Sequence, residues 1–147
     1  MKDKIAILKE KGIRITPQRL GVYDLLCNTN KHLTVDEIYR KMKDKFPAIS
    51  LATIYTILEL YGKKNLAREI RINFDKSCYD SRMDAHHHFY CKKCKKVFDV
   101  DIPLCLTLQR SEVDGHVIQE LQGYFYGICR ECRVGAVNSE NKGRAES

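Results

Sequence analysis

The sequence predicts a protein of the α/β (α+β) class, with a winged helix-turn-helix domain first and a smaller α/β domain after it. Two observations lead to this prediction. Several helical patterns are followed by a short alternating hairpin, which is the element order of a winged helix. The second half then concentrates histidines and Cys-x-x-Cys pairs, which bind transition metals. We expect domains at 1–79 and 80–136, and a disordered tail at 137–147.

The first helices are predicted from the residues at their ends. Gly12 can take the left-handed conformation that ends a short lysine-rich helix. Thr16 can cap the next helix, and Pro17 suits its first position because that position needs no N–H donor.

Two further helices begin at recognisable caps. Thr34 and Glu37 have the spacing of a capping box, and Ser50 can cap the helix that follows. We expect Gly62 to end that last helix. Its apolar stripe consists of Leu51, Ile54, Ile57, Leu58 and Tyr61.

The remaining elements are mostly strands. Ile70, Ile72 and Phe74 alternate along one strand, and a return strand lies around Cys78. In the second half, residues 86–90 and 96–101 are predicted strands, 103–112 a helix and 117–128 further strands.

The charge distribution favours a polyanion partner for the first half. Through Cys78 the chain has 16 Lys+Arg against 9 Asp+Glu, and from Tyr79 it has 10 against 10. All of the net charge of +7 therefore lies where a winged helix would contact DNA phosphates, with Tyr55 and Thr56 as candidate contacts. A solubilising surface on a structural module is the alternative.

We find no apolar run long enough to cross a bilayer and no signal peptide, so we expect a cytoplasmic protein. In that compartment we expect the seven cysteines not to form a disulfide framework. Three of them, Cys27, Cys78 and Cys105, are expected to be ordinary buried thiols.

The other four cysteines have the spacing of a tetrahedral zinc site. Cys91 and Cys94 form one Cys-x-x-Cys pair, and Cys129 and Cys132 form the second. Four thiolates leave no open position for a substrate, so we expect a structural Zn²⁺. A thiol oxidoreductase is the competing interpretation. A redox motif usually needs only one Cys-x-x-Cys pair, so the presence of two matched pairs argues against it.

The three consecutive histidines indicate a second site. On a strand, His86 and His88 lie on one face and His87 on the other, so the first two can chelate one ion. Asp99 and Asp101 share a face of the next strand. Nitrogen and oxygen ligands favour Fe(II), Mn(II) or Zn(II). The alternative is that these histidines are a hydrated surface run that binds no metal. The sequence contains no His-Glu-x-x-His motif, no nucleophilic serine motif and no phosphate-binding loop, so we expect that the protein is not an enzyme.

Taken together, five segments resemble the ferric uptake regulator (Fur) superfamily of metal-dependent bacterial repressors, over nearly all of residues 4–133. They are GIRITPQR, HLTVDEIY, SLATIYTILEL, HHHFYCKKC and YGICREC. The resemblance implies a DNA-binding domain, a dimerisation domain and a homodimer on a palindromic double-stranded operator. It implies that the protein neither associates with a membrane nor acts on a small-molecule substrate.

The resemblance also implies the sites. Structural zinc maps onto the four paired cysteines, and regulatory Fe(II) or Mn(II) maps onto His32, Asp80, His86, His88 and Asp99. One ion held by both domains would fix the DNA-reading elements relative to the dimer partner. The candidate DNA contacts are Arg14, Arg19, Ser50, Thr53, Tyr55 and Thr56.

The subtype follows from the carboxylates. Aspartate at both Asp80 and Asp99 is similar to the peroxide-sensing PerR type, in which iron-bound peroxide chemistry oxidises a histidine ligand, here His32 or His86. An iron- or zinc-uptake regulator is the alternative. Thr56 stands where many members have Arg or Asn. Leu106 and Leu121 stand at positions where a third metal site would need a carboxylate and a histidine, so we expect no third site of that kind.

Overall fold

The structure, a computed structural model, describes residues 2–29, 32–73, 76–84, 86–102, 110–119, 121 and 123–134. The chain forms two compact units, Met1–Asp84 and Ala85–Ser147. The domain boundary predicted from the sequence lies after residue 79, whereas Asp80 is the last residue of a strand in the first unit. None of the described helices combines the length and the apolar character that crossing a membrane requires.

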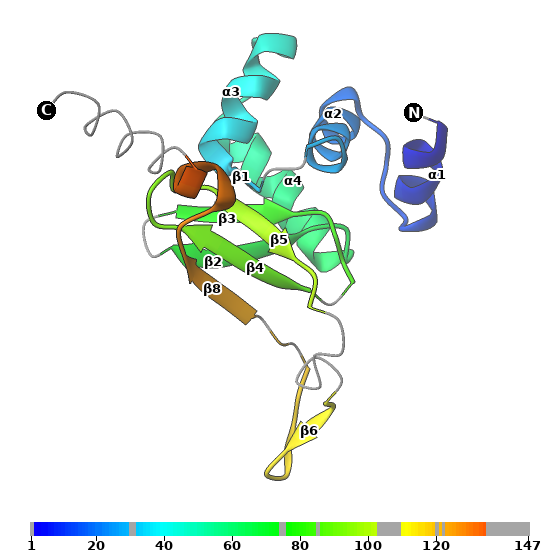
Figure 1. Cartoon of the computed structure of the whole chain (residues 1–147). Coiled ribbons are helices and arrows are strands. Elements are labelled where there is room, and N and C mark those ends of the chain that lie inside the picture. Colours follow the sequence, from blue (N-terminus) through cyan, green and yellow to red (C-terminus); the bar gives the residue numbers. More distant parts are fainter. Residues whose placement is uncertain are drawn as a thin grey trace, which may run out of the picture. The chain divides into compact units, whose positions relative to one another are not determined.

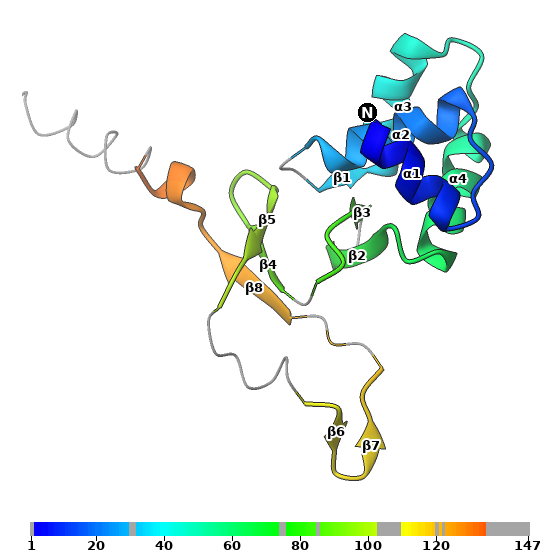
Figure 2. The ribbon, with the colours of Figure 1, turned by 90° about the vertical axis from the view of Figure 1, so that its right-hand side faces the viewer.

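The first unit contains four helices and a small sheet (Figure 1). The helices are α1 (Lys2–Glu10), α2 (Pro17–Cys27), α3 (Val35–Lys45) and α4 (Leu51–Lys63). The strands are β1 (Leu33–Thr34), β2 (Arg68–Asn73) and β3 (Lys76–Asp80). Seen from the side, the four helices lie together (Figure 2). This is a winged helix.

The predicted N-terminal caps are present. Thr16 Oγ1 accepts a hydrogen bond from the backbone N–H of Arg19 at 3.2 Å, and Ser50 Oγ accepts one from Thr53 at 3.1 Å. Thr34 and Glu37 form both hydrogen bonds of a capping box. Each cap satisfies a backbone donor that the helix itself leaves unpaired.

One C-terminal prediction is confirmed and one is wrong. Gly12, with φ +70°, ends α1 as predicted. Gly62 does not end α4, because the left-handed position falls to Asn65 (φ 52°). Asn65 donates to the Gly62 carbonyl and Leu66 donates to the Tyr61 carbonyl, which together form a Schellman motif.

The core of the first unit lies between the helices and the sheet. The predicted stripe of α4 is buried at Ile54, Ile57, Leu58 and Tyr61. Leu51 is an exception: it lies in the first turn and is 38% exposed. The Tyr61 hydroxyl donates to the Arg19 carbonyl at 2.5 Å and so ties α4 to α2.

The sheet of the first unit is antiparallel, in the order β1-β3-β2. Ile70 and Ile72 on β2 are buried, as their alternation predicts. Phe74 lies outside the described residues. Strand β1 was not predicted; it pairs Leu33 with Tyr79. This pairing brings the loop before α3 beside the end of β3.

The second unit contains a mixed sheet in the order β5-β4-β8. Its strands are β4 (His87–Cys91), β5 (Val97–Val100) and β8 (Gly123–Gly127). Strand β4 is antiparallel to β5 and parallel to β8. A hairpin of β6 (Glu112–Val113) and β7 (His116–Val117) lies away from this sheet in both views (Figures 1 and 2).

The predicted helix over 103–112 is wrong at its end, because Glu112 begins β6. Residues 103–109 and the predicted tail at 137–147 lie outside the described residues. Residues 130–134 form a helical turn, which places Cys132 on a helix rather than at a strand end.

Candidate metal centres and family

The parallel pairing of β4 and β8 brings the two cysteine pairs together. Cys91, the last residue of β4, pairs with Gly127, which lies two residues before Cys129. One sulfur atom from each of Cys91, Cys94, Cys129 and Cys132 lies within 4.8 Å of the others. The Cys94 and Cys129 sulfurs are 3.7 Å apart.

Backbone donors surround one sulfur of this cluster. The N–H groups of Cys129 and Cys94 point at Cys91 Sγ from 3.3 and 3.5 Å. Burial disfavours the thiolate of Cys91, but these N–H groups and that of Lys93 outweigh it and lower its pKa to about 6. Hydrogen bonding with Cys129, followed by burial, raises the pKa of Cys132 to about 12.

These opposite shifts follow from packing four thiols together. The first thiolate to form disfavours the others, so all four ionise together only around a cation. Four sulfur donors suit tetrahedral Zn²⁺. The predicted cysteine set therefore fits a closed zinc site.

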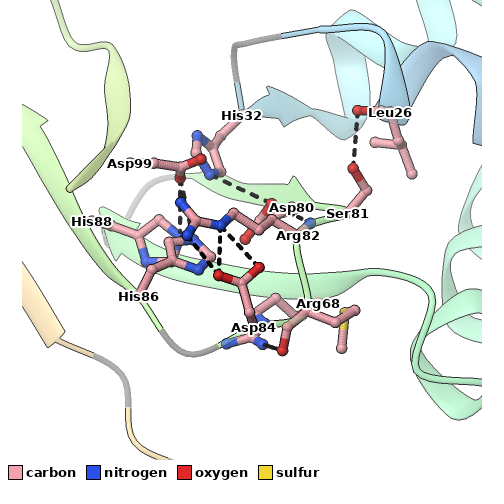
Figure 3. A network of polar contacts seen from close by, with 11 residues as sticks. Leu26, His32, Arg68, Asp80, Ser81, Arg82, Asp84, His86, His88 and Asp99 are labelled. Atoms are coloured by element: carbon pink, nitrogen blue, oxygen red, sulfur yellow. Dashed lines mark hydrogen bonds and ion pairs between the residues drawn. The ribbon is translucent and has the colours of Figure 1, made fainter. Parts of the chain in front are cut away.

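The first unit contributes a histidine and a carboxylate that face each other. Extending the β1–β3 register by one residue places His32 opposite Asp80. His32 Nε2 lies 3.8 Å from Asp80 Oδ1, and both side chains are buried (Figure 3). Asp80 Oδ1 also accepts the backbone N–H of Arg82 at 2.7 Å. We call His32 and Asp80 the first half-site.

The second unit contributes two histidines and a carboxylate. The Nε2 atoms of His86 and His88 are 3.0 Å apart, and Asp99 Oδ1 lies 3.2 and 3.8 Å from them (Figure 3). Two imidazole nitrogens and a carboxylate oxygen at these distances can bind one divalent ion. We call His86, His88 and Asp99 the second half-site.

The neighbouring predicted residues are placed differently. His87 packs against Phe125, with ring centroids 5.5 Å apart, and lies over Gly123. It therefore faces away from the second half-site, as predicted. Asp101 is exposed and lies beyond the end of β5. That both half-sites bind one ion stays a prediction.

The sequence model of the ferric uptake regulator family matches residues 10–124. The chain belongs to this family. The chain is 33% identical over 134 residues to the peroxide operon regulator of Bacillus subtilis (strain 168). The alignment covers 90% of this chain and 92% of that protein. The chain is also 33% identical over 135 residues to the peroxide-responsive repressor PerR of Staphylococcus epidermidis, with 90% of each chain covered.

Solved structures of the ferric uptake regulator family have the same fold. The Campylobacter jejuni peroxide stress regulator is 31% identical, with a TM-score of 0.68 over 87% of this chain and 98% of that chain. The Vibrio cholerae ferric uptake regulator is 25% identical, with a TM-score of 0.67 over 83% and 96%. The predicted family and fold class are confirmed.

Helix α4 carries three of the DNA contacts predicted from the sequence, Thr53, Tyr55 and Thr56, and Ser50 is its N-terminal cap. Tyr55 is 53% exposed on it, whereas Thr56 Oγ1 donates to the Ala52 carbonyl at 3.0 Å. The hydroxyls of Ser50 and Thr53 are 2.8 Å apart and bond each other.

The predicted basic contacts Arg14 and Arg19 are linked, since Arg19 Nη1 donates to the Arg14 carbonyl at 2.9 Å. Their role in DNA binding stays a prediction. Of the unpaired cysteines, Cys78 is buried as predicted, Cys27 is exposed and so was predicted wrongly, and Cys105 lies outside the described residues.

The contacts in the segment after Asp80 were not predicted from the sequence. Arg82 and Asp84 form an ion pair there, and Arg68 Nη2 donates to the Met83 carbonyl at 2.7 Å (Figure 3). The sequence did offer one signal for this ion pair, because Arg82 and Asp84 lie within four residues of the candidate ligand Asp80. Their pairing is a feature of the turn and is not encoded by a known motif.

Proposed function

We propose that this chain is a metal-dependent transcriptional repressor that senses peroxide. The observation that carries the proposal is the pair of half-sites, in which aspartate supplies the carboxylate both times, Asp80 and Asp99. The similarity to regulators named for peroxide response supports the subtype.

We propose that the two half-sites bind a single regulatory Fe(II) or Mn(II) ion. The ligands would be His32, Asp80, His86, His88 and Asp99, whose nitrogen and oxygen donors suit both ions. The four clustered cysteines would hold Zn²⁺ separately, as a folding constraint. Iron(II), when bound, supplies the peroxide reduction that oxidises a histidine ligand, for which His32 and His86 are the candidates.

The distribution of ligands gives the regulatory principle. His32 and Asp80 belong to the first unit and the other three ligands to the second. An ion shared by them would restrict how the DNA-reading unit moves relative to the dimerisation unit and so preorganise two readers on a palindromic operator. Oxidation of one histidine would remove that restraint and release the DNA.

The proposal also includes the binding partners of the protein and its location in the cell. The first unit would bind double-stranded DNA, and the second unit would form a homodimer. Candidate DNA contacts are Arg14, Arg19, Ser50, Thr53, Tyr55 and Thr56. We propose that the protein acts in the cytoplasm as a regulator, not as a metalloenzyme or thiol oxidoreductase.

The first test measures DNA binding. A duplex is selected from a random DNA pool with the zinc-loaded chain and Mn(II), and its affinity is then measured by fluorescence anisotropy. We expect selected duplexes with two-fold symmetry and an affinity that falls at least tenfold when Mn(II) is removed. A DNA affinity that does not change when Mn(II) is removed would refute the proposed metal-dependent repressor.

The second test addresses the peroxide subtype. Protein loaded with Fe(II) should lose the selected duplex after peroxide treatment and gain one oxygen atom on His32 or His86, measured by mass spectrometry. Protein loaded with Mn(II) should do neither. Retention of DNA by the iron form, with unmodified histidines, would favour an iron- or zinc-uptake regulator instead.

A matched pair of variants tests the ligands. His86→Ala should leave a folded dimer whose DNA affinity no longer responds to Mn(II). His116→Ala removes an exposed histidine from the β6–β7 hairpin and should respond as the wild type does. An unchanged metal response in His86→Ala would remove His86 from the ligand set.

A further inference from the structure

We propose that Tyr124 is a redox-active side chain beside the second half-site, and that it supplies an electron when peroxide is reduced there. Tyr126 would then carry the resulting oxidation to the surface of the second unit. The inference deepens the proposed function and rests on it. It assigns tyrosine oxidation as a second outcome of the peroxide reaction, next to oxidation of a histidine ligand.

Tyr124 lies next to a candidate metal ligand across the sheet. In the strand order β5-β4-β8, Asp99 pairs with His88, and His88 pairs with Tyr124. Side chains of paired residues on neighbouring strands project from the same face of a sheet, so Tyr124 shares the face of the second half-site. The ring centroids of His88 and Tyr124 are 6.1 Å apart. The His88 imidazole therefore connects the proposed ion to the phenol ring.

Two more tyrosines extend this pair of rings along the strands. Tyr90 and Tyr126 also pair in the β4–β8 register, and their ring centroids are 6.0 Å apart. Each lies two residues after a member of the first pair, which places it about 7 Å further along its strand and on the same face. Tyr90 is 8% exposed and Tyr126 is 51% exposed. The four rings therefore lead from the half-site to the surface of this unit.

The opposite face of the same strands has a different composition. Phe89 and Phe125 pair there, and a benzene ring resists one-electron oxidation. A phenol, by contrast, gives up an electron together with its proton. The chain contains no tryptophan, and all three tyrosines of residues 85–147 lie on the face of the half-site: Tyr90, Tyr124 and Tyr126. The most readily oxidised aromatic rings of this unit are thus beside the candidate iron ligands.

A lysine makes Tyr126 the favoured end of this path. Lys95 Nζ lies 6.0 Å from the centroid of the Tyr90 ring. A cation over an aromatic ring attracts its electrons, so Lys95 opposes the removal of an electron from Tyr90. Oxidation that leaves Tyr124 would therefore stop on Tyr126, which lies two residues further along β8.

The proposed reaction balances in atoms and electrons. The O–O bond of hydrogen peroxide breaks as it accepts two electrons, one from Fe(II) and one from the Tyr124 phenol. The phenol proton and one proton from solvent complete two water molecules, which leaves Fe(III) and a tyrosyl radical. The Tyr126 phenol then gives an electron and a proton to Tyr124, so the radical moves to Tyr126. A thiol in solution that gives a hydrogen atom to this radical restores Tyr126 and becomes a thiyl radical.

A purely structural role for Tyr124 makes a different prediction. Phenylalanine keeps the ring beside His88 and lacks only the hydroxyl, so Tyr124→Phe would leave histidine oxidation unchanged if the ring only packs. If the phenol is oxidised, it diverts peroxide from the histidine ligands. Tyr124→Phe should then raise histidine oxidation about twofold, the change expected when two routes with similar barriers compete and one is removed.

The experiment treats the zinc-loaded full chain, with Fe(II) bound, with equimolar peroxide in the absence of oxygen. Electron paramagnetic resonance detects the radical in frozen samples, and mass spectrometry measures histidine oxidation. We expect a tyrosyl signal that narrows when the wild-type chain carries ring-deuterated tyrosine and that is lost in Tyr124→Phe. A nitroso spin trap should form its adduct on Tyr126. Tyr39→Phe, which changes a tyrosine on α3 in the first unit, is the matched control and should react as the wild type does.

Three results would overturn the inference and leave the proposed function intact. They are oxidised histidine without a tyrosyl signal in the wild type, a signal of undiminished intensity in Tyr124→Phe, and unchanged histidine oxidation in that variant. A trap adduct on Tyr124 alone would overturn the transfer to Tyr126. A wild-type chain in which peroxide oxidises neither histidine nor tyrosine and leaves the DNA bound would overturn the proposed function, and the inference with it.

Discussion

Replacing Gly123 by alanine should destabilise the second unit, because His87 occupies the space that the new methyl group needs. Gly123 on β8 pairs with His87 on β4, and a Cβ at position 123 would overlap the His87 ring at Nδ1. His87 is 6% exposed, so its ring can move only by leaving the contact with Phe125.

The expected loss has two parts. Overpacking of a buried site costs about 1–3 kcal/mol, and an aromatic ring contact contributes about 0.5–1.5 kcal/mol. We therefore expect the free energy of unfolding to fall by roughly 2–4 kcal/mol. With a denaturant slope near the low end of the usual range, about 1–2 kcal/mol per molar urea, the midpoint should fall by about 2 M.

Urea unfolding of the zinc-loaded chain, followed by circular dichroism and tyrosine fluorescence, measures this loss; the chain contains no tryptophan. Gly127→Ala is the control on the same strand, because its Cβ would lie 3.2 Å from the Phe89 ring edge, which can shift slightly. The double variant His87→Ala/Gly123→Ala should be no less stable than His87→Ala. A wild-type midpoint for Gly123→Ala would refute the packing of His87 over β8.

Three other changes test the zinc site, a helix end and an ion pair. Cys91→Ser should lose zinc and unfold the second unit, whereas Cys27→Ser, which alters an exposed thiol, should keep the wild-type zinc content and melting profile. Asn65→Gly should raise the free energy of unfolding by about 0.5–1 kcal/mol in a thermal melt, because Asn65 has φ 52°; a lower melting temperature would contradict this. The hydrogen bond from Lys4 lowers the pKa of Asp24, so this pair should stabilise the fold at neutral pH and stop doing so as the pH falls below about 4. Lys4→Met should make acid unfolding less steep in that range, and an identical acid profile would show that the pair contributes nothing.

Local signals predicted well those parts of the fold that neighbouring residues determine. The capping box of Thr34 and Glu37 needs only a spacing of three residues, and it is present. The alternation of Ile70 and Ile72 likewise identified a buried strand face. Gly62 misled the prediction because Asn65 accepts the left-handed conformation and ends the helix with its own hydrogen bonds.

Features that depend on distant residues were harder to predict. Strand β1 has two residues and exists because β3 pairs with it, so no local pattern marks it. The cysteine pairs were recognised from spacing, but the parallel pairing of β4 with β8 that brings them together was not. The Arg82–Asp84 ion pair depends on a turn that Asp80 itself organises, and the exposure of Cys27 depends on which face of α2 is covered.

The parallel pairing of β4 with β8 also determines the order in which the protein can form. Residues up to Asp84 contain all the described strands of their own sheet, so the first unit can fold while the rest of the chain is still being synthesised. Strand β4 must wait for β8 to be synthesised, and Cys91 must wait for Cys132. A ribosome therefore completes the first unit before the second, and zinc can close the second unit only after Cys132 has emerged.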